Sequence, residues 1–187
     1  MTIEHPAGAW ADRIGALASE ETNGLVPNRR TCIQDQPPQG VSTITLPLAT
    51  DIAEGFYVKG DAGRLLFSTA NADPDAPCDV QPDEIDTAIC SDRVVRIFDL
   101  QVRRIENSWA GLRSFVPDGS PMVGSSDRVD GFWGLTRQRG YAIQTALALS
   151  KFAASAILKA LVTQDVLRAG FTPCMVAVNR QHSQKPA

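Results

Sequence analysis

Apolar residues follow two different spacings along this chain, and each spacing predicts a different kind of element. Between Ala7 and Ser19 they recur every three to four residues, which predicts an amphipathic helix. From Val26 onward they fall into short runs between turn residues, and these runs predict strands at Val26–Asp35, Thr43–Pro47, Gly55–Lys59 and Arg64–Thr69. The last two are joined by Gly60-Asp61-Ala62-Gly63, which is typical of a hairpin turn.

The second half of the chain carries longer apolar patterns. Pro82–Ile97 begins with proline and acidic residues and then repeats apolar positions at helical spacing, so we expect a helix packed on the sheet. Leu100–Trp109 alternates and predicts a strand. Ala142–Val162 is charged only at Lys151 and Lys159, which predicts a long helix buried on more than one side. The predicted fold class is α+β: a mixed, largely antiparallel sheet with helices on one face and a long C-terminal helix.

Composition narrows the possible partners. The 187 residues are 43% hydrophobic and 21% charged, which suits a globular domain with a real core. A net charge of −3 argues against nucleic acid as a principal partner. No apolar run reaches the roughly 18 residues of a membrane span, and the N-terminus does not resemble a signal peptide, so we expect a cytoplasmic protein. The four cysteines are scattered and are expected to be reduced thiols without a metal site.

Two polar stretches invite a ligand-binding interpretation. Arg29 and Arg30 could bind a phosphate or a carboxylate, but neighbouring residues of a strand point to opposite faces and most such pairs are solvated surface charge. Asn71–Pro82 is rich in proline and aspartate and predicts a loop. Its spacing does not match a calcium-binding EF-hand loop, since the glycine at the sharp turn and the closing glutamate are missing.

The richest stretch is Ser108–Gln144, SWAGLRSFVPDGSPMVGSSDRVDGFWGLTRQRGYAIQ. It predicts an extended segment that ends at Arg113, a turn-rich loop at Pro117–Pro121, and a strand at Phe132–Leu135. A Gly-Tyr turn then opens the long helix. Polar groups from two loops can therefore converge at the mouth of a sheet, where ligands commonly bind.

The segments WAGLR, PDGSPMVG, GFWGL and RGYAIQTALALS, in this order and spacing, resemble the C-terminal part of the FAD-dependent oxidoreductases of the glycine oxidase and D-amino-acid oxidase type. AGAWADRIG at Ala7–Gly15 extends the resemblance over most of the chain. It implies FAD as the cofactor, a substrate carboxylate held by Arg113, and a pocket lined by Tyr141. The cofactor-binding positions that it implies are Gly119, Pro121, Gly124, Arg139 and Gly140.

Two departures from the family change what we expect. The family begins with a G-x-G-x-x-G turn that holds the FAD pyrophosphate, and this chain starts about halfway through, so the dinucleotide-binding unit is expected to be missing. Met1–His5 is expected to be too short to form the strand before AGAW. Arg137-Gln138-Arg139 replaces a glycine-rich turn that lets backbone approach the flavin. The chain alone is therefore not expected to hold FAD.

The resemblance also implies a division of the chain. Residues 1–25 would be a helix remnant of the FAD domain, 26–109 the substrate-domain sheet, 110–165 the returning segment of the FAD domain, and 166–187 a tail. Because the long helix packs on the dinucleotide-binding domain in the family, we expect it to expose a large apolar face here.

Two hypotheses stay open. The first is an FAD-dependent oxidoreductase that oxidises a small amine or amino acid to an imine, with the missing half supplied by a separate N-terminal FAD-binding chain or through a homo-oligomer. The alternative is a non-catalytic remnant or subunit that cannot bind FAD on its own. The two hypotheses assign different roles to Arg113. In the first it holds the substrate carboxylate, and in the alternative it is a structural arginine that bridges loop carbonyls.

Overall fold

The computed structural model describes residues 3–5, 7–22, 24–53, 55–98, 100, 102, 104–168 and 170–178. The chain forms two compact units, one of Met1–Pro27 with Arg113–Ala187 and one of Asn28–Leu112. In chain order the elements are β1 (Ile3–His5), the 3-10 helix η1 (Gly8–Trp10), α1 (Ala11–Leu17), β2 (Val26–Asp35), β3 (Ala49–Thr50), β4 (Tyr57–Asp61), β5 (Arg64–Ser68), β6 (Asp73–Pro74), α2 (Glu84–Phe98), β7 (Asn107–Phe115), β8 (Met122–Ser125), β9 (Phe132–Thr136), α3 (Ala142–Ile157), α4 (Gln164–Arg168) and the 3-10 helix η2 (Pro173–Met175).

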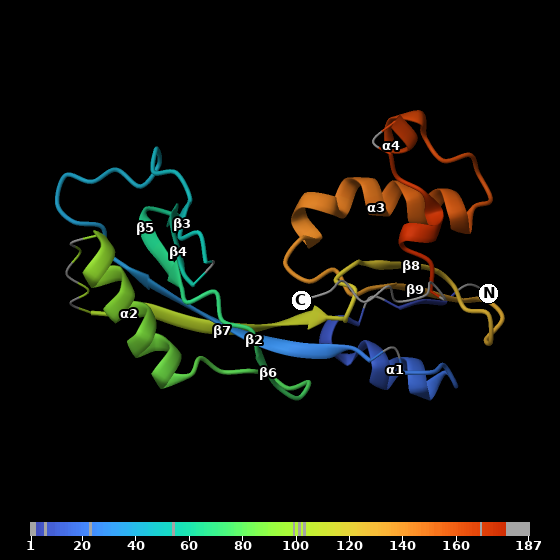
Figure 1. Cartoon of the computed structure of the whole chain (residues 1–187), viewed down its shortest axis with the longest axis horizontal. Helices are drawn as coiled ribbons and strands as arrows, with labels where there is room; N and C mark the ends of the chain where they lie inside the picture. The colour runs from blue at the N-terminus through green and yellow to red at the C-terminus, as the bar shows by residue number, and fades with distance from the viewer. Residues whose placement is uncertain are drawn as a thin grey trace. The chain divides into compact units, whose positions relative to one another are not determined.

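The first unit has three layers (Figure 1). Its sheet has the order β1-β9-β8, with β1 parallel and β8 antiparallel to β9. Successive side chains of a strand point to opposite faces. Val123 therefore packs with Leu149 and Phe152 of α3 on one face, while Met122 and Phe132 face α1 on the other.

The second unit is built on β2, which pairs with β5, β6 and β7 in a sheet continued by β4 and β3. Its pairings with β5 and β6 are antiparallel. One face of this sheet packs on α2, and the core between them consists of Ile33, Phe56, Val58, Leu65, Phe67, Cys90 and Val94. The predicted α+β class and the mixed, largely antiparallel sheet are confirmed.

The hairpin between β4 and β5 shows why the strand predictions succeeded there. Ala62 and Gly63 both adopt positive φ, 48° and 82°, which is the backbone of a tight two-residue turn whose twist matches the strands. Gly60 is needed two residues before this turn, because a Cβ at this position would lie 1.9 Å from the carbonyl oxygen of Thr43. The turn therefore fixes the register of Asp61 with Arg64.

Two strand predictions were wrong in position. Thr43–Pro47 is not a strand: pairing with β4 begins only at Ala49, beyond Pro47, which has no amide proton to donate to a ladder. In place of a strand at Leu100–Trp109, β7 begins at Asn107. The apolar alternation before it has another cause, since Leu100, Val102 and Ile105 pack against the core of the second unit.

Three further differences lie in the first unit. Ile3–His5 does form a strand, because β9 offers a parallel partner along all three residues. Strand β8, directly after the predicted loop at Pro117–Pro121, has no counterpart among the predicted strands. The predicted helix over Ala142–Val162 ends at Ile157, since Lys159 takes a left-handed φ of 54° and the chain turns back toward α4. Helix α4 extends into the segment predicted as a tail, and residues 179–187 of that tail lie outside the described residues.

Helix α3 is far more exposed than its composition indicates. Only Leu149, Phe152 and Ala153 of this helix are buried, whereas Ile143 and Leu147 are 94% and 81% exposed. Burial on more than one side was therefore wrong. The exposed apolar face expected from the family comparison is found, and it continues past the helix through Leu158 and Leu161.

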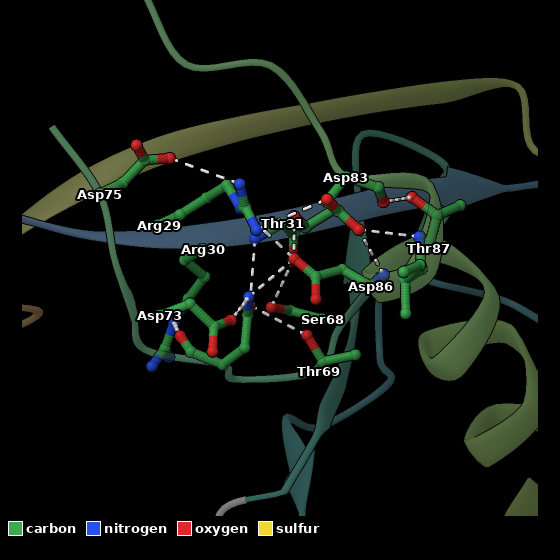
Figure 2. Close-up of polar contacts among 12 residues, drawn as sticks. Arg29, Arg30, Thr31, Ser68, Thr69, Asp73, Asp75, Asp83, Asp86 and Thr87 are labelled. Carbon is green, nitrogen blue, oxygen red and sulfur yellow. Dashed lines mark hydrogen bonds and ion pairs between the residues drawn. The ribbon is translucent and has the colours of Figure 1, made fainter. Parts of the chain in front are cut away.

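Arg29 and Arg30 are neither a ligand site nor solvated charge. The guanidinium of Arg29 lies 3.4 Å from a carboxylate oxygen of Asp75 and 3.6 Å from those of Asp83 and Asp86 (Figure 2). Asp83 also accepts hydrogen bonds from the backbone amides of Ile85 and Asp86, which caps α2. Arg29 thus ties the loop after β6 and the start of α2 to strand β2.

Replacement of Arg29 by alanine should destabilise the chain, because three half-buried carboxylates lose their common cation. We expect a loss of roughly 1–3 kcal/mol in the free energy of unfolding, between the values for exposed and buried ion pairs. The matched control is Arg96→Ala, which removes the exposed pair with Asp92 and should cost less than about 0.5 kcal/mol. Urea denaturation measures both, and equal losses would contradict this role of Arg29.

Candidate functional site

Arg113 is positioned by the end of β7 and by the loop that precedes α3. Its guanidinium lies against the backbone of Gly140, where an added Cβ would be 2.6 Å from Nη1 and 3.2 Å from Cζ. Only a glycine leaves room for this approach. The contact brings together two predicted site residues, Arg113 and Gly140, that are 27 positions apart in sequence.

Arg139 lies on the same loop and packs in a similar way. Its Cζ is 4.5 Å from the ring centroid of Phe115, a cation–π contact. A Cβ added to Gly119 would lie 2.6 Å from its Nη1, so the second glycine is also covered by a guanidinium. Phe115 and Arg113 are two residues apart on β7 and so point to the same side of the strand.

The loop between β9 and α3 keeps a conformation that suits glycine although it contains arginines. Arg137 and Arg139 have φ of 63° and 50°, in the left-handed region. A side chain in that region costs of order 1 kcal/mol or more, so other contacts must hold the loop in place. Arg137 itself is only 1% exposed, so its burial contributes to the position of the loop.

The local electrostatics favour an anion. Within the described part of the chain, the guanidinium groups of Arg113 and Arg139 form no hydrogen bond or ion pair. The first turn of α3 has no acidic residue, and the positive end of its dipole points to the same loop. Two half-buried cations without carboxylate partners beside a helix N-terminus can bind a carboxylate or another oxyanion.

The remaining predicted site residues are more dispersed. Tyr141 adjoins Gly140 and is 54% exposed, and its carbonyl accepts hydrogen bonds from the amide and hydroxyl of Thr145. Pro121 lines an apolar cavity of about 550 Å³ together with residues of α3 and α4. Gly124 lies in β8, where a Cβ would contact Cγ2 of Val178 at 3.2 Å. The structure thus groups Arg113, Gly119, Arg139 and Gly140, with Tyr141 beside them.

A nucleophilic or metal-dependent site finds no support in the described residues. Burial raises the pKa of the Cys90 thiol to about 12, helped by the neighbouring Cys32, so this thiol stays protonated and unreactive. The described residues contain no group of three or more side chains that could hold a metal ion. Among the described helices none is both long and apolar enough to cross a membrane.

Sequence reasoning missed one residue of this cluster. Phe115 supplies the ring on which the Arg139 guanidinium lies. Its position two residues after Arg113 could have identified it, because residues i and i+2 of a strand share a face. The resemblance gives Arg139 as a cofactor-binding position and Arg137-Gln138-Arg139 as the replacement of a glycine-rich turn, but nothing in the sequence shows that both arginines adopt positive φ.

The contact between Arg113 and Gly140 can be tested without any ligand. Gly140→Ala should displace the guanidinium and lower the free energy of unfolding by up to about 1 kcal/mol, because the displaced atoms are the end of a flexible side chain beside an exposed glycine. Gly111→Ala on the same strand is the control, because its Cβ would meet nothing within 4 Å. Thermal or urea unfolding compares them, and a neutral Gly140→Ala would show that the guanidinium is not held there.

Comparison with known proteins agrees with this fold. The crystal structure of glycine oxidase from Geobacillus kaustophilus superimposes with a TM-score of 0.73 at 19% identity, over 87% of this chain and 45% of that one. Iminodiacetate oxidase from Chelativorans sp. BNC1 gives 0.74 at 18% identity, over 89% and 45%. L-proline dehydrogenase from P. horikoshii gives 0.71 at 19% identity, over 84% and 42%. The chain therefore spans less than half the length of each of these proteins.

The family model for FAD-dependent oxidoreductases of the DAO type matches residues 6–156, a range that includes Arg113, the loop before α3 and nearly all of α3 itself. This match covers most of the chain, and the resemblance seen in the sequence is confirmed: the protein belongs to the DAO family of FAD-dependent oxidoreductases.

Proposed function

We propose that this chain carries the substrate-binding part of an FAD-dependent oxidoreductase that oxidises the C–N bond of a small amine or amino acid to an imine. The observation that carries the proposal is the half-buried guanidinium of Arg113, which has no hydrogen bond or ion pair within the described residues and lies at the entrance to α3. The family match supports the class of reaction. The solved structures share less than 20% sequence identity with this chain and match it over less than half of their own length. They therefore support the fold and nothing beyond it.

Arg113 would hold the carboxylate of an amino-acid substrate. A planar guanidinium donates two parallel hydrogen bonds to a carboxylate, and such charge-assisted pairs fix both position and orientation. Gly140 fixes the guanidinium against the loop, and the exposed Tyr141 next to it would line the pocket. The role of these residues is to bind and orient, since the flavin supplies the redox chemistry in such enzymes.

The residues of this chain do not fit a complete FAD. A pyrophosphate needs several backbone amides at a glycine-rich helix N-terminus, and no G-x-G-x-x-G turn occurs in this sequence. The predicted cofactor positions Gly119 and Gly140 are covered by arginine side chains, and Gly124 contacts Val178. A second polypeptide segment would therefore have to supply the greater part of the FAD site.

The exposed face of α3 supports the same conclusion. Ile143, Leu147, Leu158 and Leu161 are each at least 75% exposed, and an apolar surface of this length is typical of a site covered by another protein segment. We propose that the FAD-binding segment covers this face. A non-catalytic remnant remains the second candidate, favoured by the covered glycines at positions 119 and 140.

If Arg113 holds the substrate carboxylate, small carboxylates should bind this chain in the absence of flavin. Glycine and propionate should bind the isolated chain weakly, and Arg113→Gln should weaken this binding roughly tenfold, as expected for the loss of one charge-assisted pair. Arg113→Lys should retain part of the affinity, because it keeps the charge but loses the two-pronged geometry. Calorimetric titration measures all three chains. If Arg113→Gln binds both ligands as well as the unchanged protein, the carboxylate role is wrong.

The α3 face predicts self-association of the isolated chain. Because Ile143 and Leu158 are 94% and 75% exposed, Ile143→Gln with Leu158→Gln should reduce association without lowering the melting temperature. Phe152→Ala, on the buried side, should instead cost about 3–5 kcal/mol. Sedimentation and thermal unfolding separate these effects, and a large loss of stability in the glutamine variant would show that the face is already packed.

A further inference from the structure

We propose that Arg139 forms, with Arg113, a two-arginine site for dicarboxylates, so that the substrate class is an amine or amino acid with two carboxylate groups. This inference rests on the proposed function and adds a second anchor to it. Arg113 would hold one carboxylate as above, and Arg139 the other.

The same strand and the same loop hold both side chains. Arg113 and Phe115 are two residues apart on β7, which separates their side chains by roughly 7 Å along one face of the strand. Arg139 lies over the Phe115 ring, and Arg113 lies against Gly140, the residue next to Arg139. Both guanidinium groups are therefore held at the same loop and on the same side of β7.

Other half-buried arginines of the described chain have polar partners within it. Arg29 and Arg64 form ion pairs with carboxylates, and Arg30 and Arg93 donate hydrogen bonds to backbone carbonyls. Arg113 and Arg139 form none within the described residues, although both are half-buried. Cations that are partly removed from water and left without a carboxylate are unfavourable unless a ligand supplies one. One carboxylate would neutralise only one of the two.

The backbone of Arg139 adds a second argument. Its φ of 50° would be relaxed for glycine and is strained for arginine. Within the described residues, its side chain has the Phe115 contact but no hydrogen bond or ion pair. Ala62 and Lys159 also have a positive φ, and at both of them the chain makes a turn. Arg139 differs because no described carboxylate pairs with its charge, and we attribute the arginine at this position to that charge.

Arg139→Gly is the informative variant, because it removes the charge while it relieves the backbone. Malonate, succinate and glutarate are titrated into the 187-residue chain in parallel with propionate, and none of them can be oxidised as an amine. We expect one of the dicarboxylates to bind at least tenfold more tightly than propionate. In Arg139→Gly this preference should fall to near unity, while propionate affinity and thermal stability are kept. Arg168→Gln, an exposed arginine on α4, is the control for charge and should keep the preference.

The outcomes separate this inference from the proposed function. If Arg113→Gln weakens propionate but no dicarboxylate is preferred, the two-arginine site is wrong and the carboxylate role of Arg113 survives. A preference that persists in Arg139→Gly also overturns the assignment. If Arg139→Gly unfolds the chain or lowers its stability markedly, Arg139 acts through packing on Phe115 and the proposal fails.

Discussion

The close approach of the Arg113 guanidinium to the backbone of Gly140 is the contact on which the candidate site depends. It joins the end of β7 to the loop before α3, and it is possible only because residue 140 has no side chain. The same loop places Arg139 on Phe115 and buries Arg137, at the cost of two arginines in a left-handed backbone. Charge is thereby concentrated at the N-terminus of α3, where the helix dipole also favours an anion.

The two faces of α3 have different environments. One face packs Leu149 and Phe152 on the β1-β9-β8 sheet, which positions the helix N-terminus and the arginine loop. The other face exposes long apolar side chains along its length. In a chain that belongs to a flavoenzyme family and spans less than half of its solved relatives, two arginines without a carboxylate partner among the described residues therefore lie at the start of a helix with an exposed apolar face.

Local patterns were enough to predict the elements whose residues determine their own conformation. Strand β2 was predicted with the observed bounds, and the β4–β5 hairpin follows from a turn that needs only Ala62 and Gly63. Errors arose where distant contacts decide. The alternation at Leu100–Trp109 reflects packing on the second core rather than pairing, and Arg29 gains three carboxylate partners, Asp75, Asp83 and Asp86, that lie more than 40 residues away.

The candidate site was predictable in part for the same reason. Arg113, Gly119, Arg139 and Gly140 were identified through their family resemblance, and the structure groups them. The resemblance could not predict that the two arginine side chains cover the two glycines. That contact depends on the three-dimensional path of the loop. Phe115 was missed, although strand alternation places it beside Arg113.

The most direct test of the account is the visible absorption spectrum of the purified chain after addition of FAD and gel filtration. Our account predicts that FAD does not co-elute with the 187-residue chain, since its glycines at 119 and 140 are covered and the pyrophosphate turn is not in this sequence. A stoichiometric flavin spectrum on a monomeric species would contradict it, because the chain would then build a complete cofactor site without a second polypeptide segment.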